Sequence, residues 1–304
     1  MSASAPARPP EGSTPAVAQR PEGSAANVPV PSLEQLLAAK DALPTLPQVV
    51  RYILETLNDD NANADALVQH LNTDPAIVAR LLAAANSSAF GLSAQVASTR
   101  QAILVLGLST VRTITLATAL MERLGNVGRD GRQLWRHSLG VATCARSIAE
   151  SIDHNPEAAF SAGLLHDIGQ LLMAAVAPQA VALAIEYTRS GEVPIVAAEQ
   201  AVFGYDHALV GAELARLWRL PDDIACGIHA HHRPDDGEDG EIGDLIHIAE
   251  VLSHALDLGA VLNNRVPEVS EIALLRLGLN WSTLAARFPA IEARYDGVCQ
   301  ALGL

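Results

Sequence analysis

The chain has 304 residues, enough for one large domain or two smaller ones. Hydrophobic residues make up 49%, mostly Ala and Leu, and aromatic residues only 4%, which favours packed helices over sheet. The formal net charge is −14, and residues 1–31 contribute nothing to it because they hold two acidic and two basic side chains. This balance argues against nucleic acid and against an anionic membrane surface as partners.

Cysteine usage and hydropathy indicate the compartment. Cys144, Cys226 and Cys299 are odd in number and far apart, so neither a disulfide framework nor a thiolate zinc site is expected. We see no charged-then-apolar leader, and no apolar run that approaches the ~20 residues needed to span a bilayer. The sequence therefore predicts a cytoplasmic protein that has no contact with a membrane.

The chain divides into four segments. Residues 1–31 are rich in Pro, Ala, Ser and Gly, so we expect a disordered tail. Ser32 and Gln35 form a plausible capping box, where the folded part begins. We expect an N-terminal helical lobe over 32–125, a second helical lobe over 126–260 and a C-terminal helical extension over 261–304.

Start and stop signals divide the first lobe into short helices. Asp74 followed by Pro75 is a strong start for a helix over 76–85. Gly107 should end a helix capped by Ser98 or Thr99. Further helices are expected over 47–57, from 63 or 65 to 71, and from 109 to 124.

The second lobe and the extension follow a loop at 125–131. Pro194, Pro221 and Pro234 mark helix starts or breaks, and we find no internal repeat. Expected helices run over 133–152, 156–167, 178–189, 194–203, 206–218, 221–231, 241–257, 268–277 and 281–301. The fold class is therefore predicted to be all-α with two lobes.

The most informative motif is the pair His166–Asp167, which lies within the apolar stretch 158–173. A carboxylate in such surroundings is costly unless a histidine, an arginine or a metal ion pairs with it. Nine of the ten histidines also fall between His137 and His254. This clustering favours a common site.

A divalent metal centre is one interpretation of this cluster. Four nitrogen and oxygen ligands from three helices suit a borderline or hard ion such as Fe, Mn, Zn or Ni. A second ion would let Asp167 bridge the two, and such a site can activate water. The candidate ligands are His137, His166, Asp167 and Glu250 for the first ion, and His207, His231 and His232 for the second.

A purely structural interpretation is equally open at this point. Asp167 could cap or bond a neighbouring helix, or pair with an arginine such as Arg136. A single helical histidine is more often a surface or satisfied core residue, and we take this view for His70, His154, His247 and His254. His229 lies one turn before His232, so it could support a ligand.

The order of these residues resembles the HD superfamily, and more closely the HDOD family of HD-related output domains. The resemblance covers roughly residues 38–258. Its motifs are Leu43–Pro47 (LPTLP), Asp74–Ala76 (DPA), Asn86–Gly91 (NSSAFG), Ala102–Gly107 (AILVLG), Gly163–Gly169 (GLLHDIG), Phe203–His207 (FGYDH), Trp218–Pro221 (WRLP) and His231–Pro234 (HHRP).

The resemblance implies an all-helical, two-lobed fold and a bacterial signalling role through contacts with other proteins. HDOD members are usually regarded as lacking catalysis, whereas relatives with an HD-GYP motif are metal-dependent cyclic-dinucleotide phosphodiesterases. This chain departs from those enzymes: Gln170 replaces their lysine, Glu250 replaces their usual Asp, and no Gly-Tyr-Pro segment is present. Losing the lysine weakens the stabilisation of phosphate charge.

We therefore expect a non-catalytic signalling module, with a metal-dependent phosphohydrolase as the alternative. A third interpretation, a DNA-binding helix-turn-helix over Ala102–Leu120, is disfavoured. Its second helix carries one positive charge, Arg112, within two turns, and recognition helices need more basic or amide side chains.

Overall fold

The structure is a computed structural model that describes residues 28–39, 52, 64–87, 95–124, 131–191, 193–234, 240–259 and 265–302. Within these residues the secondary structure is helical and no strand is present, which confirms the expected fold class. The helices are α1 (Leu33–Ala38), α3 (Ala64–Leu71), α4 (Pro75–Ala85), α5 (Thr99–Leu124), α6 (Gly131–Ala149), α7 (Pro156–Leu165), α8 (Ile168–Val176), α9 (Pro178–Gly191), α10 (Ile195–Phe203), α11 (His207–Leu217), α12 (Asp222–Ala230), α13 (Gly240–Ala255), α14 (Glu271–Arg276), α15 (Trp281–Ala285) and α16 (Phe288–Leu302).

Local capping explains where several helices begin. The Ser32 hydroxyl accepts from the Gln35 amide, and the Gln35 side chain accepts from the Ser32 amide, so the expected capping box is present. The Asp74 carboxylate accepts from the first amides of α4, and Gln101 N donates to the Ser98 hydroxyl. Gly107 has φ +74° and divides α5 into two helices, as its position predicts.

Some expectations differ from the structure. The helix expected over 47–57 and the loop expected at 125–131 lie outside the described residues, except that Tyr52 and Gly131 are helical. α8 was not expected as a separate helix, and the helix expected over 281–301 is two helices, α15 and α16. The stretch Pro156–Val176 is long and apolar enough to cross a membrane, contrary to the expectation of no such run; 83% of its most apolar window is buried inside the protein, as in a core helix.

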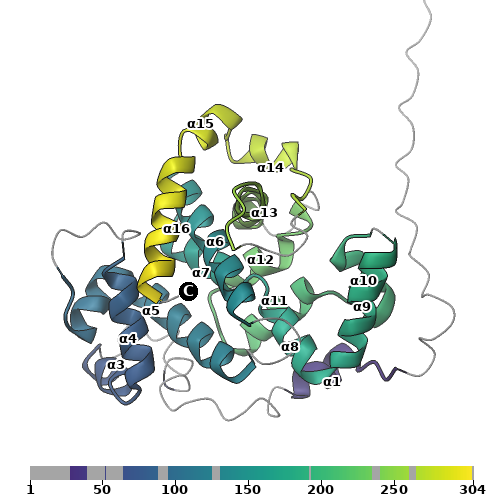
Figure 1. The fold of residues 1–304 in the computed structure, drawn as a ribbon, viewed down its shortest axis with the longest axis horizontal. Helices are drawn as coiled ribbons and strands as arrows, with labels where there is room; N and C mark the ends of the chain where they lie inside the picture. Colours follow the sequence, from purple (N-terminus) through teal and green to yellow (C-terminus); the bar gives the residue numbers. More distant parts are fainter. Residues whose placement is uncertain are drawn as a thin grey trace, which may run out of the picture.

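Residues 28–39 pack on the second lobe. Val28 and Val30, which the sequence places in the tail, contact the core, and the Tyr205 hydroxyl donates to the Pro31 carbonyl over 2.8 Å. α1 contacts α8 and α11, and Figure 1 shows it beneath α8 and α9. Its Leu36 side chain is fully buried. α1 therefore packs against helices that come much later in the sequence.

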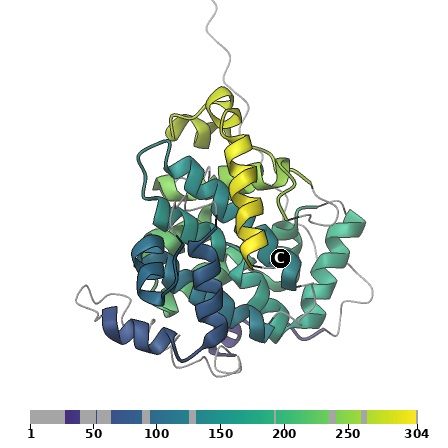
Figure 2. The same cartoon turned by 60° about the vertical axis from the view of Figure 1, so that its left-hand side comes forward.

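The site lies in the second lobe, where α6, α7, α8, α11, α12 and α13 pack together (Figure 1). α6 and α7 approach closely because Gly163 has no side chain: a Cβ there would lie 2.9 Å from the Ala142 Cα. The first lobe joins through α5, whose Thr113 hydroxyl donates to Ser161 of α7 over 2.8 Å. α16 packs against both α4 and α6, so it contacts both lobes; Figure 2 shows it running down between them.

Candidate metal centre

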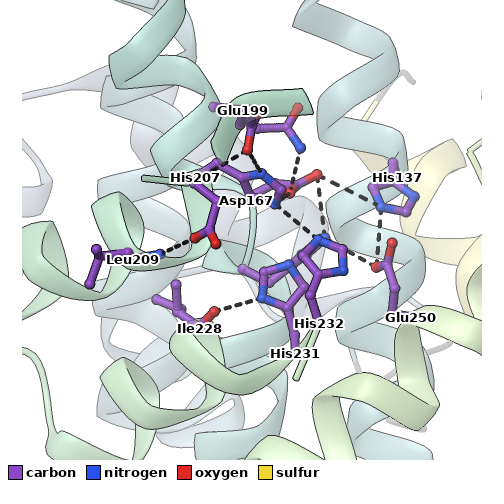
Figure 3. A network of polar contacts seen from close by, with 12 residues as sticks. His137, Asp167, Glu199, His207, Leu209, Ile228, His231, His232 and Glu250 are labelled. Carbon is purple, nitrogen blue, oxygen red and sulfur yellow. Dashed lines mark hydrogen bonds and ion pairs between the residues drawn. The ribbon is translucent and has the colours of Figure 1, made fainter. Parts of the chain in front are cut away.

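The seven predicted ligands come from five separate segments and meet in the interior of the second lobe (Figure 3). Two of the segments are turns that directly follow a helix, where side chains are free of the helical periodicity. The ligands are His137 of α6, His166 and Asp167 between α7 and α8, His207 in the first turn of α11, His231 and His232 after α12, and Glu250 of α13.

The first half of the cluster surrounds one oxygen of Glu250. Its Oε2 lies 3.1 Å from His166 Nε2 and 3.3 Å from His137 Nε2. Asp167 Oδ2 lies 3.4 Å from the same His166 nitrogen and 3.9 Å from that of His137. Two imidazoles and two carboxylates therefore converge, as the sequence predicts.

The second half holds three histidines. His207 Nε2 lies 3.2 Å from Asp167 Oδ1 and 3.1 Å from His232 Nε2. The rings of His231 and His232 have centroids 3.9 Å apart, and ligand atoms of the three histidines lie within 4.8 Å of one another. Because Asp167 directs one oxygen to each half, it lies where a bridging carboxylate would be needed.

Hydrogen bonds on the outer side of two rings fix their orientation. His166 Nδ1 lies 2.8 Å from the Gly163 carbonyl oxygen, and His231 Nδ1 lies 2.6 Å from that of Ile228. Since a carbonyl oxygen only accepts, Nδ1 carries the hydrogen in both rings. Their Nε2 atoms face the cluster, which is how metal-binding histidines are usually held.

Glu199 is a functional candidate that the sequence analysis missed. Its Oε2 accepts from His207 Nδ1 over 2.6 Å and from the His207 backbone amide over 2.9 Å. Glu199 is buried, and it is the one ionisable residue of α10, in which Gln200 is the other polar residue. A lone carboxylate in such a helix was the signal that could have found it.

His254 also belongs to the cluster, contrary to the expectation that it is incidental. Its Nε2 lies 2.9 Å from Glu250 Oε1, and its ring centroid lies 5.0 Å from that of His137. His254 follows Glu250 by four residues on α13, so the two share a helix face. That spacing was present in the sequence and was not used.

Three further histidines, His247, His70 and His154, behave as expected. His247 is a satisfied core residue: its Nδ1 donates to the His231 carbonyl over 2.9 Å, and its Nε2 accepts from the Ser270 amide over 3.1 Å. His70 stacks on Tyr52, outside the cluster. His154 accepts from the amide of the next residue, also away from the site.

Of the structural roles considered for Asp167, bonding to neighbouring helices is present, whereas a helix cap and a pair with Arg136 are not. It occupies the first position before α8 but makes no capping hydrogen bond with its side chain. Arg136 does not pair with Asp167; its guanidinium lies beside Tyr295 of α16, and this neighbour raises the Arg136 pKa. Asp167 Oδ1 instead accepts from the Gln170 amide over 2.7 Å. The partners of this buried acid are imidazoles and an amide.

Burial and neighbouring charges act strongly on the site. Burial opposes ionisation of Asp167, but His166 and His207 outweigh it and hold the Asp167 pKa well below its usual range. Burial likewise opposes protonation of His166, yet Asp167 and Glu250 raise its pKa to about 10. For His231, burial and the two neighbouring histidines lower the pKa to about 3. Protons on some of the imidazoles thus balance the carboxylates.

The donor set fits a divalent ion. Within the described residues, His166 Nε2, His231 Nε2 and Glu250 Oε2 are buried and make no hydrogen bond. Buried polar atoms of native proteins are nearly always paired, so a group of three that face one another indicates a shared partner. A divalent cation would satisfy the lone pairs of all three at once and displace the protons from the imidazoles.

Most of this centre is buried. His166, His207 and His231 are fully buried, and Asp167 is 7% exposed. A cavity of about 20 Å³ adjoins Asp167, enough for about one water molecule. Its other walls are formed by Leu134, Trp135, Ser138, Leu164, Leu165, Ile168 and Leu171.

A helical lobe with a His, a His–Asp pair, further histidines and a late carboxylate around one point defines an HD-type centre. The HDOD domain family model matches residues 43–234, more than half of the chain. The chain therefore belongs to the HDOD domain family.

Solved structures agree with this assignment. An HDOD domain protein of unknown function from Geobacter sulfurreducens is 26% identical, with a TM-score of 0.71 over 88% of this chain and 96% of that one. A candidate phosphohydrolase from Shewanella amazonensis SB2B is 25% identical, with a TM-score of 0.70 over 88% of this chain and 97% of that one. Both share the fold of this chain, but only the Shewanella protein is described as a phosphohydrolase.

Among curated proteins, ribonuclease Y from Mesoplasma florum is 31% identical over 123 residues. This match covers 40% of this chain and 19% of that enzyme. The chain spans less than two fifths of the length of the curated relatives it matches.

Proposed function

We propose that this chain is a non-catalytic HDOD signalling module that acts in the cytoplasm through contacts with other signalling proteins. Its His–carboxylate cluster would hold one or two divalent ions, Fe, Mn, Zn or Ni, as part of the fold. The ligands would be His137, His166, Asp167, His207, His231, His232 and Glu250. The family supports the signalling role, and the net charge of −14 disfavours nucleic acid as a partner.

The observation that carries this proposal is the side chain beside Asp167 at the position of the family's lysine. The cavity that adjoins Asp167 is lined mostly by apolar side chains and has room for about one water molecule. The side chain next to Asp167 at the family's lysine position is Gln170, a neutral amide whose nitrogen is already bonded to Asp167. A transferring phosphoryl group needs fixed positive charge, which this amide does not supply.

A second function, a metal-dependent phosphohydrolase, is favoured by Asp167, whose two oxygens face the two halves of the cluster. The likeness to the Shewanella protein and to ribonuclease Y points the same way. When bound, two ions would supply an activated water and a clamp for the phosphoryl group.

A hydrolysis assay separates the two functions. The purified chain, loaded in turn with Fe, Mn, Zn or Ni, is incubated with bis-p-nitrophenyl phosphate, cyclic dinucleotides and single-stranded RNA. We expect the same background rate as for Asp167→Asn, which keeps the shape of the side chain and removes its charge. Metal-dependent turnover that Asp167→Asn abolishes would establish the phosphohydrolase and refute the non-catalytic proposal.

A further inference from the structure

We propose that His254 is a positioning residue of the metal centre: it holds one oxygen of Glu250 so that the other faces His137 and His166. This inference rests on the metal site of the proposed function. It adds a residue that lies outside the predicted ligand set and beyond residues 43–234, which match the family model.

The two oxygens of the Glu250 carboxylate have different neighbours. Oε1 lies 2.9 Å from His254 Nε2 in a hydrogen bond, while Oε2 lies 3.1 Å from His166 Nε2 and 3.3 Å from His137 Nε2. Oε2 is buried and makes no hydrogen bond with the described residues. The oxygen that His254 leaves available is therefore the one that faces the cluster.

The length of the Glu250 side chain explains why an anchor is needed. Glutamate has one more rotatable bond than aspartate, and fixing a long side chain costs conformational entropy. His254 lies one turn further along α13, so the same helix supplies both groups at a fixed separation. Its side chain is 14% exposed, and that of Glu250 is 7% exposed.

Other ligands of the cluster are anchored in the same way from outside. His166 is held by the Gly163 carbonyl and His207 by the Glu199 carboxylate. Such outer partners orient ligands, and their loss typically weakens metal affinity by about 10- to 100-fold. His254 gives Glu250 the support that these groups give to the histidines.

Metal affinity of the 304-residue chain tests the role. The metal-free protein is titrated with Co²⁺, whose absorption reports the ligands, and with Zn²⁺ in competition. We expect His254→Ala to weaken affinity about 10- to 100-fold, and His254→Gln, which keeps a side-chain N–H donor, to recover most of the loss. His154→Ala, a histidine substitution outside the cluster, should bind as the unsubstituted chain does. Circular dichroism and urea unfolding establish that each variant is folded.

A double-mutant cycle shows whether His254 acts through Glu250. In Glu250→Asp the shorter side chain withdraws the carboxylate from His254. The further change His254→Ala should therefore cost no additional metal affinity in that variant. Fully additive losses would overturn the proposal, as would His254→Ala binding as tightly as the unsubstituted chain. If His254→Ala removes one imidazole from the coordinated Co²⁺, His254 is itself a ligand and the positioning role is wrong. If the unsubstituted chain binds neither ion, the metal site of the proposed function is refuted, and the role of His254 with it.

Discussion

Replacing Gly169 with alanine should disrupt the close packing of α8 on α11, which places Asp167 beside His207. Gly169 lies in α8, two residues after Asp167, and packs directly on the start of α11. A Cβ at this position would lie 2.0 Å from the His207 carbonyl oxygen and 2.8 Å from the Gly211 amide nitrogen. Carbon and oxygen normally approach to about 3.3 Å, so the helices would have to separate by more than 1 Å.

The free energy of unfolding should fall by about 2 kcal/mol in Gly169→Ala. Overpacking typically costs about 1–3 kcal/mol, and the upper end applies because the clashing atoms are backbone. The higher helix propensity of alanine offsets about 1 kcal/mol of this. The same displacement would lengthen the 3.2 Å separation of His207 Nε2 and Asp167 Oδ1, so metal affinity should fall as well.

Urea unfolding and Zn²⁺ titration measure the two effects. Gly278→Ala is the matched control: Gly278 has φ +62°, and a Cβ there meets nothing within 4 Å. That variant should lose only the ~1 kcal/mol cost of the left-handed backbone and should keep its metal affinity. The reasoning is refuted if Gly169→Ala is as stable as the unsubstituted chain, or if it loses stability while its metal affinity stays unchanged.

Three further predictions concern the surroundings of the site. Glu199→Ala leaves two buried donors of His207 without an acceptor, so urea unfolding should show a loss of about 2–4 kcal/mol; Glu199→Gln should lose less, and equal losses would show that acceptor capacity is not the cause. Tyr205→Phe removes the hydrogen bond to Pro31, so amides of α1 should exchange hydrogen about fivefold faster, equivalent to about 1 kcal/mol; unchanged exchange would contradict this. Zn²⁺ at a hundred times its dissociation constant should raise the free energy of unfolding by about 2.7 kcal/mol, and this gain should vanish in His231→Ala; an equal gain in that variant would place the ion elsewhere.

Local signals in the sequence predict much of the helix pattern. Ser32, Asp74 and Gly107 start or stop helices by hydrogen bonds and backbone conformations that involve only their near neighbours. α8 was missed because its residues, Ile168–Val176, continue the apolar run of the preceding helix, so composition marks no boundary between the two. The break between α15 and α16 was signalled by Pro289 and was not used.

The candidate site was only partly predictable for a related reason. The seven candidate ligands were identified because their residue types and order match a known pattern, and the structure brings their side chains together. Glu199 was missed because its partner His207 is reached by a turn between two helices, whose geometry the sequence does not state. The packing of α1 on α8 and α11 was equally hidden, because a cap shows where a helix begins and not which surface it contacts.

The place of α16 has a consequence for how the molecule is made. The helix that contacts both α4 and α6 follows every other described helix along the chain. On the ribosome it emerges after them, so α4 and α6 acquire their shared neighbour only once the rest has been synthesised. A nascent chain that stalled before residue 288 would expose on both helices the surfaces that α16 covers, and these surfaces would be targets for chaperones.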